Sequence, residues 1–140
     1  MFPNAKGSEL FSVLATIDPA SQAVGTTSTG WISAGNHHNL LALIQSGALG
    51  TNATLDAKLQ QAQDASGTGA KDLTGKAITQ IVKASGDAKQ ATIDLKQEDL
   101  DFNNGFKFFR LTATVGTAAS LIAASVLLIS VSGDTSGTGL

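Results

Sequence analysis

The sequence predicts an all-β domain, an antiparallel two-sheet β-sandwich of about eight strands. A jelly roll is one arrangement of strands that fits this prediction. Short runs of residues alternate between apolar and polar side chains, as strands with one buried face do. Glycine-containing turns separate these runs at short intervals. Of 140 residues, 15 are glycine and only 14% are charged, and small uncharged side chains favour strands and turns over long helices.

The length predicts a single folded domain with flanking segments. A chain of this size can bury a sizeable core without disulfides or structural metals, and it has no cysteine. We expect an N-terminal arm over residues 1–9, the sandwich over 10–131 and a flexible Gly/Ser/Thr-rich tail over 132–140. The first residues lack an apolar run after a basic start, so they do not read as a secretory signal.

The first three strands follow from alternation and turn residues. Residues 11–17 alternate and are expected to end at Asp18-Pro19, because proline interrupts strand pairing. Residues 26–32 are rich in threonine and precede a cluster of turn formers. Residues 39–45 form a short apolar run closed by Ser-Gly, which suits a buried strand better than a helix.

The stretch LDAKLQQAQDASGTG, residues 55–69, fits a helix or a strand. Its residues propagate helices well, yet Leu55, Ala57 and Leu59 recur at every second position. Neighbouring strand-like segments favour a strand, because tertiary pairing overrides local propensity. Further strands are expected at 77–82, 91–95, 106–115 and 120–131, with a loop at 71–76 and a polar connection at 96–105.

Residues 111–131 carry no charge over 21 positions, a length that could cross a bilayer as a helix. The segment GTAAS inside it suggests instead a turn, so that strands 106–115 and 120–131 form a terminal hairpin. In a strand, Leu127 and Leu128 face opposite sides, and both sides of this strand are largely apolar. We therefore expect one side to face the core and the other to face a neighbouring subunit.

No catalytic or cofactor motif is complete. GAKDLTGK (69–76) has five residues between its glycines, where a phosphate-binding loop has four. DLDFNNG (99–105) places its glycine one position late for a calcium loop. The adjacent His37 and His38 diverge in either a strand or a turn, which disfavours a metal site. We expect no cofactor and no enzymatic activity.

The charge and the aromatic content of the sequence narrow the classes of molecule that the chain could bind. A formal net charge of −2 without runs of like charge argues against direct nucleic-acid binding. Trp31 is the only tryptophan, whereas sugar-binding faces usually offer several aromatic rings, so we expect it to anchor the core or a subunit contact. The candidate interface residues are Phe2, Trp31, His37, His38, Leu127 and Leu128.

Four segments in order carry a family resemblance: LDAKLQQAQD (55–64), AITQI (77–81), TIDL (92–95) and FKFFRL (106–111). With the apolar run before them and the apolar strand after them, they resemble the small head structural proteins of tailed bacteriophages, a β-sandwich family that decorates or cements capsids. The resemblance covers about residues 39–131. The sequence departs from the family pattern at Phe108-Phe109, where tyrosine is expected, and at Leu73, where tryptophan is frequent.

The resemblance implies that 55–64 is a strand and that the chain is a virion protein on the capsid surface. It implies binding to the major capsid protein, bridging of capsid subunits and homo-oligomer formation, without membrane or nucleic-acid contact. Two alternatives stay open. The chain could be another virion component, such as a head fibre, neck or tail protein, or a module that binds host surfaces or glycans.

Overall fold

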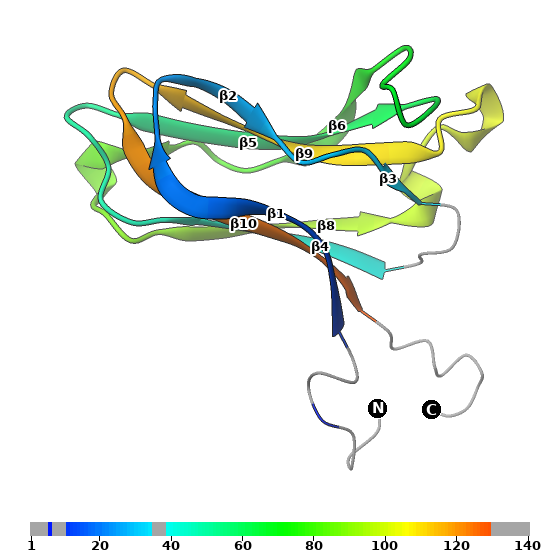
Figure 1. Cartoon of the computed structure of the whole chain (residues 1–140), viewed down its shortest axis with the longest axis horizontal. Coiled ribbons are helices and arrows are strands. Elements are labelled where there is room, and N and C mark those ends of the chain that lie inside the picture. Colours follow the sequence, from blue (N-terminus) through cyan, green and yellow to red (C-terminus); the bar gives the residue numbers. More distant parts are fainter. Residues whose placement is uncertain (1–5, 7–10, 35–38, 130–140) are drawn as a thin grey trace.

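The computed structural model describes residues 6, 11–34 and 39–129. Two antiparallel sheets face each other (Figure 1). Sheet A holds, in spatial order, β1 (Phe11–Gln22), β10 (Ser120–Ile129), β4 (Asn39–Ser46) and β8 (Gln90–Lys96). Sheet B holds β2 (Gly25–Ser28), β9 (Phe108–Gly116), β5 (Thr54–Ala62) and β6 (Lys71–Ala77), with β3 (Ile32–Ser33) beside β9 and β7 (Ile81–Val82) beside β5. Three 3-10 turns complete the described elements: η1 (Lys83–Ser85), η2 (Gln97–Asp99) and η3 (Phe102–Asn104).

The pairing is that of a jelly roll. Eight of the described strands pair as a nested series, β5 with β6, β4 with β8, β2 with β9, and β1 with β10. This is one long antiparallel hairpin that wraps into two layers, after which β10 joins β4 and β9 joins β5. The predicted all-β antiparallel sandwich is therefore confirmed.

The core lies between the sheets and comes from alternate residues of each strand. On β5, Leu55, Ala57 and Leu59 point inward and are almost fully buried. Directly opposite on β9, Val115 and Leu111 do the same. Sheet A contributes its inward row from β4, β8 and β10: Leu40, Ala42, Ile44, Ile93, Leu95, Ile122, Ala124 and Val126. Burial of these rows fixes the register, because a slip by one residue would turn every side chain to the other face.

The stretch 55–69 begins as a strand, β5, and then turns. The strand prediction is confirmed up to Ala62, after which Asp64 closes a turn by accepting hydrogen bonds from the backbone of Ser66 and Thr68 at 2.9 and 3.1 Å. The predicted strands at 39–45 and 91–95 are confirmed as β4 and β8, and the predicted strand at 106–115 overlaps β9, which runs from Phe108 to Gly116.

The predicted end of the first strand at Asp18-Pro19 is wrong. β1 continues to Gln22 because it is an edge strand, and its register shifts between Ile17 and Ala20 so that Pro19 has no partner residue. A second shift follows Val13, and it turns the apolar side chains from one side of the sheet to the other. Val13 is exposed, whereas Ile17 is buried.

The predicted loop at 71–76 is also wrong, because these residues form the edge strand β6. Only Leu73 of this strand is buried, so its pattern carries little apolar signal. The predicted strand at 77–82 is correspondingly shorter. It is interrupted over residues 78–80 and resumes as β7.

The predicted terminal hairpin is wrong in its pairing. β9 lies in sheet B and β10 in sheet A, so residues 117–119 carry the chain from one layer to the other. The uncharged stretch 111–131 is therefore strand rather than helix as far as it is described, and no described helix has the length and apolarity to span a membrane.

Candidate functional site

The outer side of sheet A carries a row of apolar side chains over β1, β10 and β4, which we call the β10 face. Antiparallel register sets Val13, Leu127 and Leu41 side by side across these three strands. The face comprises Phe11, Val13, Thr16, Leu41, Leu43, Leu121, Ala123, Ser125 and Leu127.

Three large apolar side chains of the β10 face are open to solvent, and Leu41, Leu43 and Leu127 beside them are half-buried. Val13 is 63% exposed, Phe11 46% and Leu121 45%. Only Val24 joins them as a strongly exposed large apolar residue in the described part of the chain. Single exposed apolar residues are ordinary on protein surfaces, but a contiguous group over three strands marks a contact surface.

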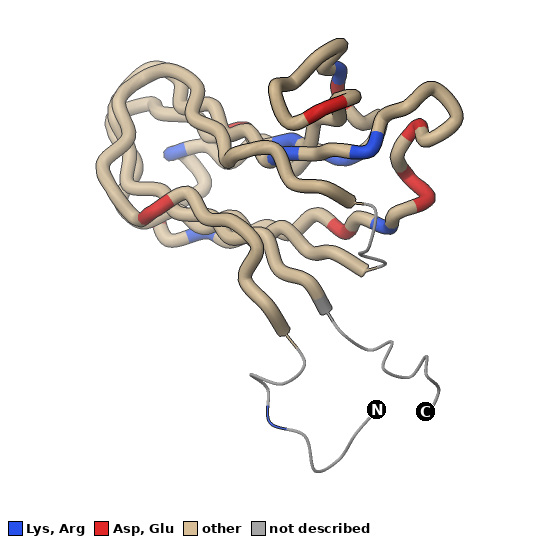
Figure 2. Tube along the Cα trace, turned by 45° about the vertical axis from the view of Figure 1, so that its right-hand side comes forward, with Lys and Arg blue, Asp and Glu red and all other residues tan. Residues whose placement is uncertain are grey.

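The β10 face also lacks charge. Asp18 is the only charged residue of β1, β4 and β10, and it stands on the edge strand, where the Thr16 hydroxyl donates to its carboxylate at 2.9 Å. Figure 2 shows the lower ends of β1 and β10 without charged residues. Charged side chains resume on β8, whose outward positions include Asp94 and Lys96.

The β10 face is uneven along its strands. Phe11 and Val13 lie at one end, beside the end of β10. At the other end, a hollow of about 410 Å³ is lined mainly by apolar and small residues of β1, β4 and β10: Pro19, Ala20, Gln45, Ser46, Gly47, Leu121, Ile122 and Ala123. The two ends of the face are thus different in shape.

The outer side of sheet B is polar, and we call it the β9 face. It carries Thr26 and Ser28 of β2, Arg110, Thr112 and Thr114 of β9, and Asp56, Lys58 and Gln60 of β5. Hydroxyl pairs join β2 to β9, with Thr26 3.1 Å from Thr114 and Ser28 3.1 Å from Thr112.

Gln60 connects the centre of the β9 face. Its Oε1 accepts hydrogen bonds from Arg110 Nε at 3.0 Å and from the Thr112 hydroxyl at 3.2 Å. Its Nε2 donates to Asp72 Oδ1 at 3.0 Å, and Lys58 Nζ lies 3.0 Å from the other oxygen of Asp72. The hydrogen bond from Gln60 and the ammonium of Lys58 lower the pKa of Asp72. The polar groups of this face are therefore satisfied within the chain.

Trp31 lies half-buried at the border of the β9 face. The guanidinium of Arg110 stacks over its ring at 4.5 Å, a cation–π contact. Gly67, at φ +86°, packs so closely that a Cβ there would lie 2.7 Å from the indole nitrogen. The ring thus holds the Gly67 turn and Arg110 together, and its contacts are made inside the chain.

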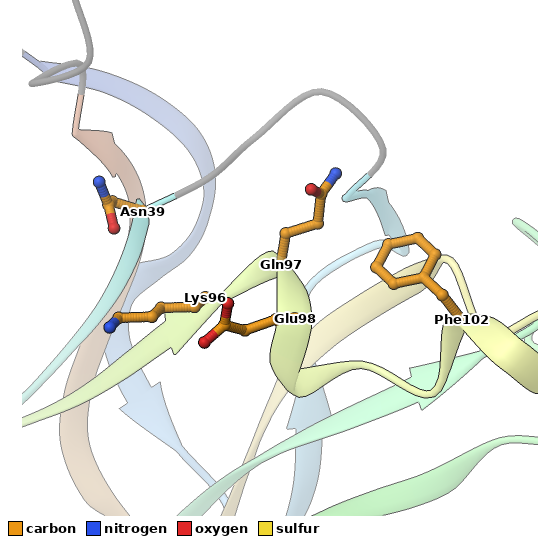
Figure 3. Close-up of a pocket in the computed structure, with 5 residues that line it drawn as sticks. All are labelled: Asn39, Lys96, Gln97, Glu98 and Phe102. Atoms are coloured by element: carbon orange, nitrogen blue, oxygen red, sulfur yellow. The ribbon is translucent and has the colours of Figure 1, made fainter. Parts of the chain in front are cut away.

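A hollow of about 420 Å³ lies where β4 and β8 meet η2 and η3 (Figure 3). Asn39, Lys96, Gln97, Glu98 and Phe102 line it. The side-chain amide of Gln97 donates a hydrogen bond at 2.9 Å to the carbonyl of Ala34, the residue that follows β3, so it links η2 to the end of β3. The lining offers one cation, Lys96, and one carboxylate, Glu98.

The incomplete motifs occupy structural positions. Asp101 accepts hydrogen bonds from Asn104 at 2.9 Å and Lys71 at 3.0 Å, and these contacts lower its pKa. Lys76 lies 3.3 Å from Asp99. Among the described residues, no group of three or more His, Cys, Asp or Glu side chains could hold a metal ion.

The structure describes only some of the predicted interface residues. Leu127 points outward in the β10 face, whereas Leu128 points inward and packs against the core. Phe2, His37 and His38 lie outside the described residues.

Sequence reasoning missed Phe11 and Val13 as members of the same surface. One signal was available, because residues 19–55 and 111–133 contain no charged residue. β4 and β10 both come from these two segments, and the jelly-roll order makes them neighbours in one sheet.

Comparison with known proteins finds solved structures of similar fold. No protein family model and no curated protein sequence matches the chain. A chain in the cryo-EM structure of Broad Bean Stain Virus superposes with a TM-score of 0.52 at 10% identity, covering 94% of this chain and 90% of that one. Empty particles of cowpea mosaic virus give 0.46 at 9% identity, covering 89% and 88%. The CBM22-1-GH10 modules of Clostridium thermocellum xylanase 10B also give 0.46, at 10% identity, covering 83% and 26%. At 10% identity the likeness to the Broad Bean Stain Virus chain shows a shared sandwich fold and no more.

Proposed function

We propose that this chain is a non-enzymatic structural protein of a virus particle, and specifically a decoration or cement protein on the capsid of a tailed bacteriophage. The observation that carries this proposal is the β10 face, an uncharged apolar surface three strands wide on a rigid sandwich. Such a surface serves contact with other protein surfaces, because exposed apolar groups are stabilised when a partner removes them from water.

The contrast with the β9 face supports the same proposal. A protein that binds a small polar ligand presents polar groups that await a partner, whereas the groups of the β9 face are bonded to one another. Trp31 is likewise engaged by Arg110. The β10 face is then the surface that a partner protein would bury. The repeating lattice of a capsid offers such a partner in many copies.

The phage assignment rests on the motif order at 55–64, 77–81, 92–95 and 106–111. The fold is compatible with it, because jelly rolls build many capsid components. In this role the chain would bridge neighbouring major capsid subunits, on the outside of the shell, and add contacts that subunits alone do not make.

Particle imaging tests the proposal. Capsids assembled without this protein are imaged by cryo-EM before and after addition of the purified chain. Decoration predicts new density in many copies that follow the symmetry of the shell. Density at one vertex or along the tail would instead assign the chain to the neck, fibre or tail, and absence of binding to any part of the particle would contradict a virion role.

A further inference from the structure

We infer that the β10 face binds a second copy of this chain, so that two sandwiches pack sheet A against sheet A about a two-fold axis. The inference goes beyond the proposed function, because this dimer forms without a capsid. It starts from the exposed side chains of Phe11, Val13 and Leu121, which leave apolar area in water in the monomer.

The lack of charge at the centre of the β10 face indicates that its partner is a second copy of the chain. Apart from Asp18 at its edge, the β10 face offers no charge with which to recognise a charged surface. An opposing surface must therefore be uncharged and apolar over at least three strands, because an unpaired charge buried there would be costly. The chain itself presents a surface of that kind, whereas its β9 face carries Asp56, Lys58 and Arg110.

Shape favours a two-fold axis that lies in the interface and crosses the strands at right angles. This axis sets each position along β1 and β10 against the opposite end of the same face on the other copy. Phe11 and Val13 of one copy then stand over the hollow beside Ala20 and Leu121 of the other. Both copies make this contact, so the protruding end and the hollow end complement each other twice.

The size of the face indicates a weak dimer. Three strands about 4.8 Å apart, with about eight residues each at 3.3 Å per residue, cover roughly 400 Å² of sheet per copy. Two copies together then bury on the order of 800 Å², in the range of weak, transient interfaces below about 1,200 Å². A dimer this weak dissociates readily, so the same face stays available to a capsid subunit when a particle is present.

Analytical ultracentrifugation of the full chain, without particles, tests the dimer. At roughly 100 μM the wild type should sediment as a dimer that dissociates on dilution. Leu127→Asp should weaken the association at least about thirtyfold, since it places an unpaired carboxylate in the interface. Thr26→Asp, a matched change on the exposed edge of the β9 face, should sediment like the wild type.

Cross-linking tests the orientation of the two copies in the dimer. The chain has no cysteine, so only the introduced thiols react. In Val13→Cys/Ser21→Cys both thiols lie on the outer side of β1, opposite Leu127 and Leu121, and those of one copy are about 20 Å apart along the strand. A short bismaleimide should therefore join them between copies and yield a covalent dimer. In Val13→Cys/Thr26→Cys the thiols lie on opposite faces, and we expect far less dimer.

Each result bears on the inference. A monomeric wild type at all concentrations, with a folded Leu127→Asp that behaves alike, would overturn it, because the face would then be covered by the chain's own termini or await the capsid. Particle binding by such a monomer would leave the proposed function standing. A dimer that Leu127→Asp leaves intact would place the contact elsewhere and also overturn the inference.

Discussion

The two outer faces of this sandwich differ although the same chain builds both sheets. The β9 face pairs its hydroxyls, amide, guanidinium and carboxylates with one another, centred on Gln60. The β10 face has Val13, Leu121 and Leu127 in corresponding outward positions and only Asp18 at its edge. A single domain needs one buried side per sheet, so the apolar character of the second side of sheet A calls for another partner.

The comparison also separates stability from association. The β9 face holds strands of one monomer together through side-chain contacts, so changes there should alter unfolding. The β10 face has unfilled contact area, so changes there should alter association and leave unfolding almost unchanged.

The largest expected effect separates the two sides of β10. Leu128→Asp should lower the free energy of unfolding by roughly 3 kcal/mol, because an unpaired carboxylate would replace a half-buried side chain that packs against the core. Leu127→Asp should change the unfolding of the monomer by less than about 1 kcal/mol, because its side chain faces outward. Urea unfolding of both variants, at a concentration where the chain is monomeric, measures the difference. Equal destabilisation would mean that β10 has two buried sides within one monomer.

A medium effect is expected on the β9 face. Gln60→Ala removes the acceptor of Arg110 and Thr112 and the donor to Asp72, so it should cost about 1–2 kcal/mol of stability. Self-association should stay as in the wild type. Thermal unfolding and sedimentation of the same sample check both statements, and weaker dimerisation would show that the two faces are coupled.

Acid should act on the polar network and leave the β10 face alone. The pKa of Asp72 is lowered in the folded chain, by the hydrogen bond from Gln60 and by Lys58. Its contribution to stability is therefore full above the ordinary value of 3.8 and is lost as the pH falls through the lower folded-state pKa. Chemical unfolding between pH 6 and about pH 3 should show the loss, and Asp72→Asn should reduce its slope. A loss that begins near neutral pH would contradict this origin.

Salt should produce the smallest effect. Raising sodium chloride from about 0.1 to 1 M screens exposed charges, so it should lower stability slightly through pairs such as Lys58–Asp72. The dimer constant should change by no more than about twofold, since the β10 face carries no charge at its centre. Sulfate should strengthen the dimer, because it favours apolar burial. Dissociation in sodium chloride would reveal an ionic interface.

The sequence predicts the fold well where one face of a strand is buried. β5, β8 and β9 follow from the alternation of apolar residues and β4 follows from its short apolar run, and these strands supply most of the core. β6 escapes prediction because it is an edge strand with Leu73 as its one buried residue. The pairing of β10 with β1 and β4 joins residues more than 75 positions apart, and no local pattern records it.

The candidate surface could be predicted only in part. A strand that is apolar on both sides implies a second contact, but sequence alone does not choose between Leu127 and Leu128. Packing against sheet B makes that choice, and it turns Leu128 inward. Val13 joins the face because of the register shift that follows it in β1, and such a bulge leaves no clear mark in the sequence.

The most direct test of the difference between the faces is the occupancy of particles by two matched variants. Capsids are incubated with the wild-type chain, with Leu127→Asp and with Thr26→Asp, and the bound copies per particle are counted. We predict that Thr26→Asp binds like the wild type and that Leu127→Asp, although folded, is lost from the particle or reduced at least about tenfold, the effect of about 1.4 kcal/mol. Equal occupancy by all three chains would contradict the assignment of the β10 face as the contact surface.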